Sequence, residues 1–195
     1  MKIAFFDFDG TITTQDSLPD FIQFAVGKPK YYWSLCLLSP MLLAYVLKLL
    51  PNHLAKEKML GYFFKGWPQS TFQAIADDYA ARQIDKIVRQ KALEKLHWHQ
   101  AQGHKVVIVS ASMSNWLKDW CADKNIALIS TELEIKDGKL TGKFATKNCH
   151  GKEKVNRIKA QYSLQDYSYI YAYGDSSGDK EMLALANEAF YQSFL

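Results

Sequence analysis

Two aspartates close an apolar run near the start of the chain, and their types and spacing suit metal-assisted chemistry. The run Lys2–Phe8 is strand-like, and it leads through Asp7 and Asp9 into a turn. Side chains alternate along a strand, so both carboxylates leave it in the same direction. Such a pair repels unless a cation or a shared proton compensates, and Mg²⁺ with oxygen ligands does this well. The alternative is a purely structural role, in which the two aspartates form a turn or cap a helix. That role does not account well for two carboxylates directly after a fully apolar run.

A second acidic segment, GDSSGD, follows another strand-like run later in the chain. Asp175 could supply a third carboxylate to the same ion, and Asp179 a fourth. Aspartate at the beginning of a helix is also a common cap, which is the alternative for Asp179.

One further strand end offers groups that could bind a phosphate. Ser110 ends the β-branched run Lys105–Val109, and Ala111, Ser112 and a predicted helix follow it. A hydroxyl together with free backbone N–H groups at a helix start can cradle a phosphate. An N-cap role is the alternative for the serine.

Two lysines lie close together near the start of another predicted helix. Lys152 and Lys154 follow Gly151. Cations at a helix N-terminus oppose the helix dipole, which is unfavourable unless an anion lies nearby. A solvated charged face is the alternative interpretation.

Alternating strand and helix patterns are expected to position these residues. We predict strands at residues 2–8, 105–110, 129–136, 139–144 and 169–173, with an edge strand at Phe190. We predict helices at residues 18–26, 55–64, 71–87, 90–102, 113–124, 152–162 and 177–187, the first of them capped by Asp16 and Ser17. Strand–helix alternation indicates βαβ units, and hence a parallel sheet with helices on both faces.

The sequence therefore predicts an α/β fold with a Rossmann-like parallel sheet. An all-helical insertion after the first strand lies over the carboxyl edge, where ligands bind in such sheets. We assign residues 1–16 and 89–195 to the core and residues 17–88 to the insertion.

The most apolar stretch of the chain, Tyr31–Leu50, lies within this insertion. Its length would just cross a bilayer, but Pro40 falls in its middle and Lys48 lies inside its end. We favour two short helices, broken at Pro40, that form the core of a helical subdomain. A surface that touches lipid or an apolar substrate is a further option, and a transmembrane helix is the weakest.

Length and composition fit a folded domain with a sizeable insertion. The chain has 195 residues, of which 48% are hydrophobic and 23% charged, which excludes disorder and low-complexity sequence. The net charge of +4 is too small to indicate a nucleic-acid partner. Residues 13–104 hold 11 Lys and Arg against 7 Asp and Glu. This bias indicates either a solvated face or attraction to an anionic ligand or membrane surface.

The three cysteines, Cys36, Cys121 and Cys149, are scattered along the chain. They form neither a disulfide framework nor a zinc motif. A strand-like run and acidic residues begin almost at once, so we expect no signal peptide and a cytoplasmic location.

Taken in order, the segments FFDFDGT, VVIVS, GKEK and YGDSSGD resemble the haloacid dehalogenase-like (HAD) hydrolase superfamily. They reach from Ile3 to Asp179. The position of the helical insertion is similar to that of the C1-capped class. The segments GTITTQDS, VSAS and NCHGKEKV resemble subfamily IB, the phosphoserine phosphatase-like hydrolases.

The resemblance implies a Mg²⁺-dependent phosphomonoester hydrolase. Asp7 would be the nucleophile that takes the phosphoryl group as an aspartyl phosphate. Asp9 would be the general acid for the leaving alcohol and then the base for water. The ion would be held by the Asp7 carboxylate, the Asp9 backbone carbonyl and Asp175, with Asp179 behind them or acting through water.

The resemblance also implies groups that bind the phosphate and the substrate. Ser110, with Ala111 and Ser112, would contact the phosphoryl group. A lysine would neutralise charge on the phosphate and on Asp7. Lys154 fits the sequence pattern of subfamily IB and is preferred. The spacing in phosphoserine phosphatases proper would select Lys152.

Asp16 occupies the place where phosphoserine phosphatases carry a glutamate that meets the substrate ammonium. It is shorter than that glutamate, and a helix cap is the alternative. The apolar stretch Tyr31–Leu50 suits an apolar or lipid-bearing substrate better than a free amino acid. We therefore expect a small alcohol phosphate or a lipid phosphate, with peripheral membrane contact through the cap left open.

Four alternative functions are weighed at this point. Phosphotransfer, as in mutases, and phosphoserine hydrolysis would use the same fold. A receiver-type switch would carry its phosphorylated aspartate after a middle strand of the chain, and here it follows the first. A membrane-binding module with a vestigial site would lack a catalytic residue, and none is missing.

Overall fold

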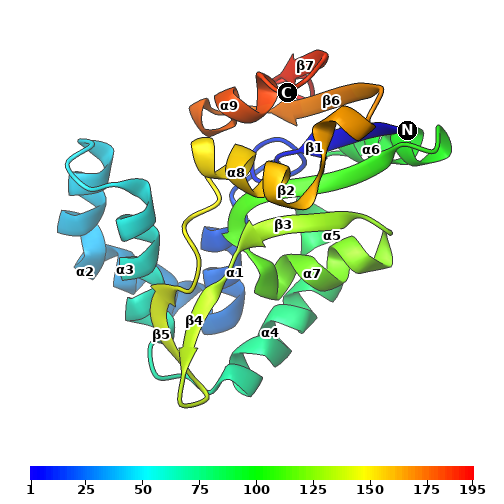
Figure 1. Ribbon diagram of the computed structural model, residues 1–195. Helices are drawn as coiled ribbons and strands as arrows, with labels where there is room; N and C mark the ends of the chain where they lie inside the picture. The colour runs from blue at the N-terminus through cyan, green and yellow to red at the C-terminus, as the bar shows by residue number, and fades with distance from the viewer.

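The computed structural model describes residues 1–195 and contains a five-stranded parallel sheet and a separate two-stranded hairpin (Figure 1). The sheet order is β3-β2-β1-β6-β7, and the hairpin joins β4 to β5. The strands are β1 (Lys2–Phe6), β2 (Lys105–Met113), β3 (Ala127–Thr131), β4 (Leu133–Lys136), β5 (Lys139–Phe144), β6 (Tyr169–Gly174) and β7 (Glu188–Tyr191). The predicted α/β class with a parallel, Rossmann-like sheet is confirmed.

Most helices lie either between β1 and β2 or on the two faces of the sheet (Figure 1). They are α1 (Ser17–Val26), α2 (Lys28–Val46), α3 (Asn52–Phe64), α4 (Gln69–Arg82), α5 (Ile84–Ile87), α6 (Gln90–Ala101), α7 (Ser114–Asp123), α8 (Lys152–Gln161) and α9 (Lys180–Leu183). Short 3-10 turns occupy Leu164–Asp166 and Ser177–Asp179.

Strand β1 is apolar on both sides because both faces of the sheet are covered. Ala4 and Phe6 belong to a core that includes residues of α6 and α7. Ile3 and Phe5 belong to a second core on the other face, which includes residues of α8 and α9. The parallel pairing of β1 with β2 and β6 brings the carboxyl ends of these strands to one edge.

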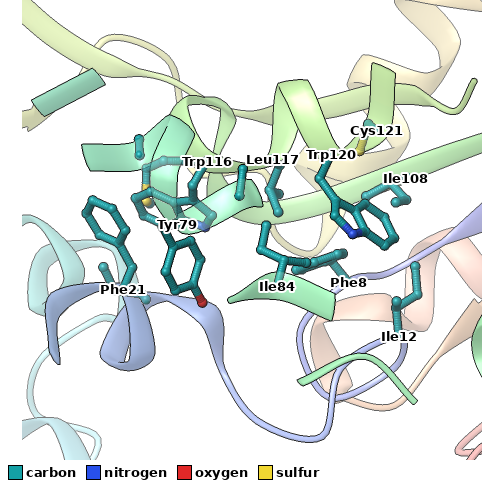
Figure 2. Packing of buried hydrophobic residues seen from close by; sticks show 14 of the residues in the cluster. Phe8, Ile12, Phe21, Tyr79, Ile84, Ile108, Trp116, Leu117, Trp120 and Cys121 are labelled. Carbon is teal, nitrogen blue, oxygen red and sulfur yellow. The ribbon is translucent and has the colours of Figure 1, made fainter. Parts of the chain in front are cut away.

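The first core extends without a break into the helical insertion (Figure 2). Phe21 of α1 stacks on Trp116 of α7, with ring centroids 4.5 Å apart. Phe8, just beyond β1, meets Trp120 of α7 edge to face at 5.6 Å. Aromatic pairs of this kind stabilise packing beyond the area they bury. They hold α1 and the loop after β1 against α7.

Helix α2 corrects the expectation of two helices broken at Pro40. The helix runs unbroken from Lys28 to Val46 with Pro40 inside it. Proline has no backbone N–H to donate to the carbonyl four residues earlier, which belongs to Cys36. The Ser39 hydroxyl donates to that carbonyl instead, at 2.8 Å. The Ser39 side chain thus replaces the backbone hydrogen bond that Pro40 cannot donate to the Cys36 carbonyl.

The expectation that Tyr31–Leu50 forms a core is right for only one side of α2. Tyr31 and Ser34 are buried. Trp33, Leu37 and Leu43, on the opposite side, are exposed. None of the helices is both long and apolar enough to cross a lipid bilayer.

Two predicted elements are shorter or more divided than expected. The predicted strand 129–136 is two strands, because the chain leaves the sheet after Thr131 and β4 pairs with β5. The predicted helix 177–187 has only a 3-10 turn and the four residues of α9. There the Asn187 backbone N–H donates to the Ile170 carbonyl at 2.9 Å, which draws the chain back to the sheet as β7.

The predicted helix 71–87 is likewise divided, into α4 and α5. The break falls at Gln83, whose φ of −117° departs from helical geometry.

The β4–β5 hairpin packs against α3. The Phe144 backbone N–H donates to Glu57 Oε1 at 2.8 Å, and the Gly66 N–H donates to the Leu140 carbonyl at 2.8 Å. Gly142, with a φ of 83°, lies so close to α3 that a Cβ atom there would be 2.3 Å from the Gly61 Cα. This close approach requires glycine.

Replacing Gly142 with alanine should therefore destabilise the protein more than replacing Gly138. Both glycines have positive φ, so each alanine costs about 1–2 kcal/mol in backbone strain. A Cβ at Gly138 meets nothing within 4 Å, whereas at Gly142 two backbones must separate, which costs about 1–3 kcal/mol more. Urea unfolding measures both free energies. Equal losses in the two variants would contradict the close approach.

Candidate active site

A cavity of about 550 Å³ lies where the carboxyl ends of β1 and β6 meet the helical insertion. Its polar lining consists of Asp7, Asp9, Asp16, Asn52, Lys56, Ser112, His150, Lys154, Asp175, Ser176, Ser177 and Asp179. Its other residues are Leu18, Pro19, Tyr31, Leu35, Leu42, Tyr45, Ala55, Met59 and Ala111. Most of the charged residues therefore come from the sheet edge, and all the apolar ones except Ala111 come from the helical insertion.

A buried lysine joins two of the aspartates. Lys154 Nζ lies 2.6 Å from Asp7 Oδ1 and 2.6 Å from Asp179 Oδ1. All three residues are buried, with Lys154 only 2% exposed. A buried ammonium of this kind requires the carboxylates, because an unpaired charge is costly to bury.

The three charges shift one another's ionisation. Burial raises the pKa of Asp7 to about 7, although the Lys154 ammonium opposes the rise. Burial alone would lower the pKa of Lys154, but attraction to Asp7 and Asp179 outweighs it and holds that pKa above its usual value. Burial would raise the pKa of Asp179, and Lys154 with Ser176 brings it below its usual value instead.

Helix α8 decides which of its two first-turn lysines enters the site. Lys154 is buried there, and Lys152 is exposed. Two positions along a helix rotate a side chain by roughly 200°, so both cannot face the same way. The Gly151 N–H donates to the Gly178 carbonyl at 3.0 Å, which fixes the start of α8 beside the acidic segment.

The loop after β6 orients the other two acidic side chains. Thr11 donates its hydroxyl to Asp175 Oδ1 at 2.9 Å. Asp179 Oδ2 accepts from the Ser176 N–H at 3.0 Å and from its hydroxyl at 2.8 Å. The Ser176 Oγ in turn accepts from the Gly178 N–H at 3.2 Å, and the segment forms a capping box. Gly10 has a φ of 79°, and a Cβ there would lie 2.3 Å from Asp175 Oδ2. The glycine after Asp9 thus makes room for the carboxylate from the second strand.

Asp9 is held by donors from two other elements. The Ser17 N–H, at the start of α1, donates to Asp9 Oδ1 at 2.7 Å, and the Ser112 hydroxyl donates to Asp9 Oδ2. The Ser17 and Ser112 hydroxyls are 3.0 Å apart, and Trp116 Nε1 donates to Ser17 Oγ at 3.2 Å. This chain of hydrogen bonds runs from the aromatic core to the cavity.

The structure places some of the residues expected to bind substrate on the cavity surface and one of them away from it. Ala111 and Ser112 line the cavity, and so does Asp16. Ser110 is fully buried and does not line it; its hydroxyl accepts from the Ser112 N–H at 3.0 Å. Burial, with the charge of Asp9 second, raises the pKa of Asp16.

The interpretation of the sequence missed two basic residues of the cavity, Lys56 and His150. Lys56, on α3, donates to the Ala111 carbonyl at 3.3 Å and adds a second lysine to the cavity lining. His150 precedes α8, and burial together with Lys154 and Lys56 lowers its pKa. Only the packing of α3 over the sheet edge shows that Lys56 faces the site, because nothing in its local pattern differs from that of a surface lysine.

The acidic groups fit a hard divalent cation. Asp7, Asp175 and Asp179 each offer an oxygen within 4.8 Å of the others. All the donors are oxygens, and the aspartates that line the cavity outnumber its lysines. Oxygen-only, anionic sites of this kind bind Mg²⁺ or Ca²⁺ rather than softer metals.

Comparison with known families agrees with this geometry. The model of the haloacid dehalogenase-like hydrolases matches residues 4–184. The chain belongs to the haloacid dehalogenase-like hydrolase family.

Individual relatives are similar over nearly the whole chain. Protein CicA of Caulobacter vibrioides is 34% identical, across 97% of this chain and 85% of that protein. A Mycobacterium tuberculosis protein named as a probable phosphatase is 27% identical, across 95% and 67%. A structure of phosphoserine phosphatase with an analogue of its phospho-aspartyl intermediate has a TM-score of 0.68 at 17% identity, across 96% and 84%. The family match makes this chain a hydrolase, and two of the proteins that it resembles carry phosphatase names.

Replacing Lys154 with methionine should destabilise the protein strongly, and replacing Lys152 should not. The first change leaves two buried carboxylates without their cation, at a cost of about 3–5 kcal/mol. The second alters an exposed side chain and should stay within about 0.5 kcal/mol. Unfolding in urea, with chelator present, compares the two. The loss in Lys154→Met should shrink as pH falls, because protonation discharges the carboxylates. A pH-independent loss would contradict this origin.

Proposed function

We propose that the protein is a Mg²⁺-dependent phosphomonoester hydrolase with Asp7 as its nucleophile. One observation carries the proposal: Asp7 lines the cavity with Oδ1 bound by Lys154, while Oδ2 makes no hydrogen bond within the protein. One oxygen is thus held in place and the other is left to react. Attack by Oδ2 on phosphorus forms the aspartyl phosphate as the bond to the substrate alcohol breaks.

Asp9 transfers the protons in both steps of this proposal. It gives a proton to the leaving alkoxide, and then it takes one from the water that attacks the aspartyl phosphate and releases phosphate. The Ser17 N–H and the Ser112 hydroxyl hold its side chain. A hydroxyl can donate to a carboxylate or accept from a carboxylic acid, so Ser112 can bond Asp9 in either protonation state.

We assign Mg²⁺ to Asp7, the Asp9 backbone carbonyl and Asp175, with Asp179 beside them. Bound there, the ion would neutralise charge on the phosphoryl oxygens and on Asp7. The grouping of the three carboxylates supports this assignment.

The protein's own cations and N–H groups bind the phosphoryl group in this proposal. Lys154 offsets negative charge at Asp7, and Lys56 adds positive charge to the cavity lining. The irregular end of β2 at Ala111 and Ser112 supplies the phosphate cradle, and Ser110 shapes it through the Ser112 N–H. Fixed donors of this kind stabilise charge that develops in the transition state.

We propose that the helices between β1 and β2 act as a C1-type cap, as in subfamily IB. Residues 17–88 would then form the cap, with residues 1–16 and 89–195 as the core. The apolar part of the cavity comes largely from this segment, through Tyr31, Leu35 and Leu42. It favours an alcohol phosphate with an apolar part, including a lipid phosphate. Phosphoserine hydrolysis and phosphotransfer are the alternatives that a substrate panel separates.

Replacing Asp9 with asparagine should trap the intermediate when the leaving group needs no acid. With p-nitrophenyl phosphate the first step should survive, because nitrophenolate leaves unprotonated. The second step should fail for lack of a base. We expect a burst of up to one nitrophenolate per enzyme, and mass spectrometry should locate a hydroxylamine-labile phosphate on Asp7. Alkyl phosphates should not react.

Asp7→Asn is the matched control and should give neither burst nor label. A label on Ser110, the absence of any burst in single-turnover experiments, or normal alkyl phosphate turnover by Asp9→Asn would each contradict the assignment.

Removing the metal should abolish phosphate release. Excess chelator should stop turnover of amino-acid, sugar, polyol and lysophospholipid phosphates alike. Mg²⁺ should restore activity, and Ca²⁺ should not, because its larger and looser coordination shell would misplace Asp7. Phosphate release measured by colorimetry tests this. Full activity in chelator would exclude the metal, and transfer to a sugar without phosphate release would indicate a mutase.

A further inference from the structure

Helix α2 is apolar around its whole circumference, which is unusual for a helix at the surface. Tyr31, Leu35 and Leu42 face the cavity. Trp33 and Leu37 lie on the opposite side and are exposed. One side is thus explained by the active site, and the other side has no partner within the chain.

The unpartnered side is large and continues past the end of α2. We call it the outer α2 face, and it comprises Tyr32, Trp33, Leu37, Leu43, Val46, Leu47 and Leu49. Trp33 is 69% exposed and Leu49 is 76% exposed. Half of the large exposed hydrophobic residues of the protein lie on this face. Gathered apolar side chains of this kind mark an interaction surface.

The charges around this face indicate what covers it. Residues 21–56 contain no aspartate or glutamate, but they contain Lys28, Lys30, Lys48 and Lys56. Lys28 and Lys30 are exposed at the beginning of α2, and Lys48 is exposed just after its end. The apolar face is therefore bracketed by cations and complements a surface that is apolar inside and anionic outside.

A bilayer with anionic lipids has this chemistry. Leucines enter the acyl boundary, tyrosine and tryptophan suit the headgroup level, and lysines meet the lipid phosphates. A second copy of the chain would bring the same lysines together in a symmetric interface, without acids from this segment to pair with them. No helix can span the bilayer, so the contact lies in its surface.

We propose that the outer α2 face docks the protein onto an anionic membrane surface, with α2 lying in the plane of the interface. The cavity then lies on the other side of the same helix, roughly 10 Å from the headgroups. Phosphomonoesters with apolar tails are concentrated at that surface. This consequence for the substrate rests on the proposed hydrolase function, whereas the docking itself does not.

The test uses the full chain and measures binding apart from turnover. The Asp7→Asn variant in chelator is sedimented with vesicles of phosphatidylcholine and phosphatidylglycerol mixed two to one, or of phosphatidylcholine alone. We expect binding to the mixed vesicles to be at least about 10-fold stronger and to weaken as salt rises. A failure of the hydrolase proposal would leave this result unchanged.

Paired variants separate apolar from electrostatic contributions. Trp33→Gln with Leu37→Gln should weaken binding about 10-fold or more, whereas Leu195→Gln, at a comparably exposed site, should not. The triple change of Lys28, Lys30 and Lys48 to glutamine should weaken it by about 5-fold per lysine. The same change at the exposed Lys91, Lys118 and Lys159 is the matched control.

Proteins that carry Asp7→Asn are expected to be inactive, so hydrolysis of p-nitrophenyl phosphate cannot show whether they are folded. Circular dichroism therefore checks the fold of every variant made in the Asp7→Asn protein. The same surface changes in the wild-type background should leave p-nitrophenyl phosphate hydrolysis unchanged. Equal binding to both vesicle types, or binding unaffected by Trp33→Gln with Leu37→Gln, would overturn the proposal. So would a concentration-dependent dimer that these two changes dissolve, since the face would then bind a second copy.

Discussion

The rest of the site depends on one buried ion triplet, in which Lys154 lies between Asp7 and Asp179. The chain must bring together three segments that are far apart in sequence, since leaving one of these buried charges without its partners costs about 3–5 kcal/mol. The parallel pairing of β1 with β6 aligns the two acidic strand ends. Gly174, at the end of β6, leaves room for Asp179, since a Cβ there would lie 2.5 Å from the Asp179 Cβ.

A second set of contacts connects this triplet to the hydrophobic core. Trp116 stacks on Phe21 and also donates to Ser17, which in turn lies beside Ser112 and holds Asp9. The aromatic core that attaches the insertion to the sheet is therefore also the support for Asp9, the proposed acid and base. The same residues pack the core and hold this carboxylate, so the position of α1 and the position of Asp9 are set together.

Helix α2 joins the proposed chemistry to the proposed membrane contact. Its inner side gives the cavity an apolar wall, and its outer side stays exposed because no element of the chain packs over it. Ser39 allows the helix to continue through Pro40 and so to present both sides along its full length. The apolar composition of Tyr31–Leu50 suggested a buried core. In the structure, α2 instead has one apolar side on the cavity and one apolar side exposed.

The local sequence determined that acidic side chains follow β1 and β6. An apolar run ending in Asp7 and Asp9, and a second ending in Asp175, predicted an acidic edge of a parallel sheet, because strand alternation and parallel topology are local rules. The motif order also indicated the family. Which lysine is buried, the inward position of Lys56, the removal of Ser110 from the cavity lining and the continuity of α2 were decided by tertiary structure. Each depends on which side of an element meets a distant neighbour, and no short-range pattern encodes that.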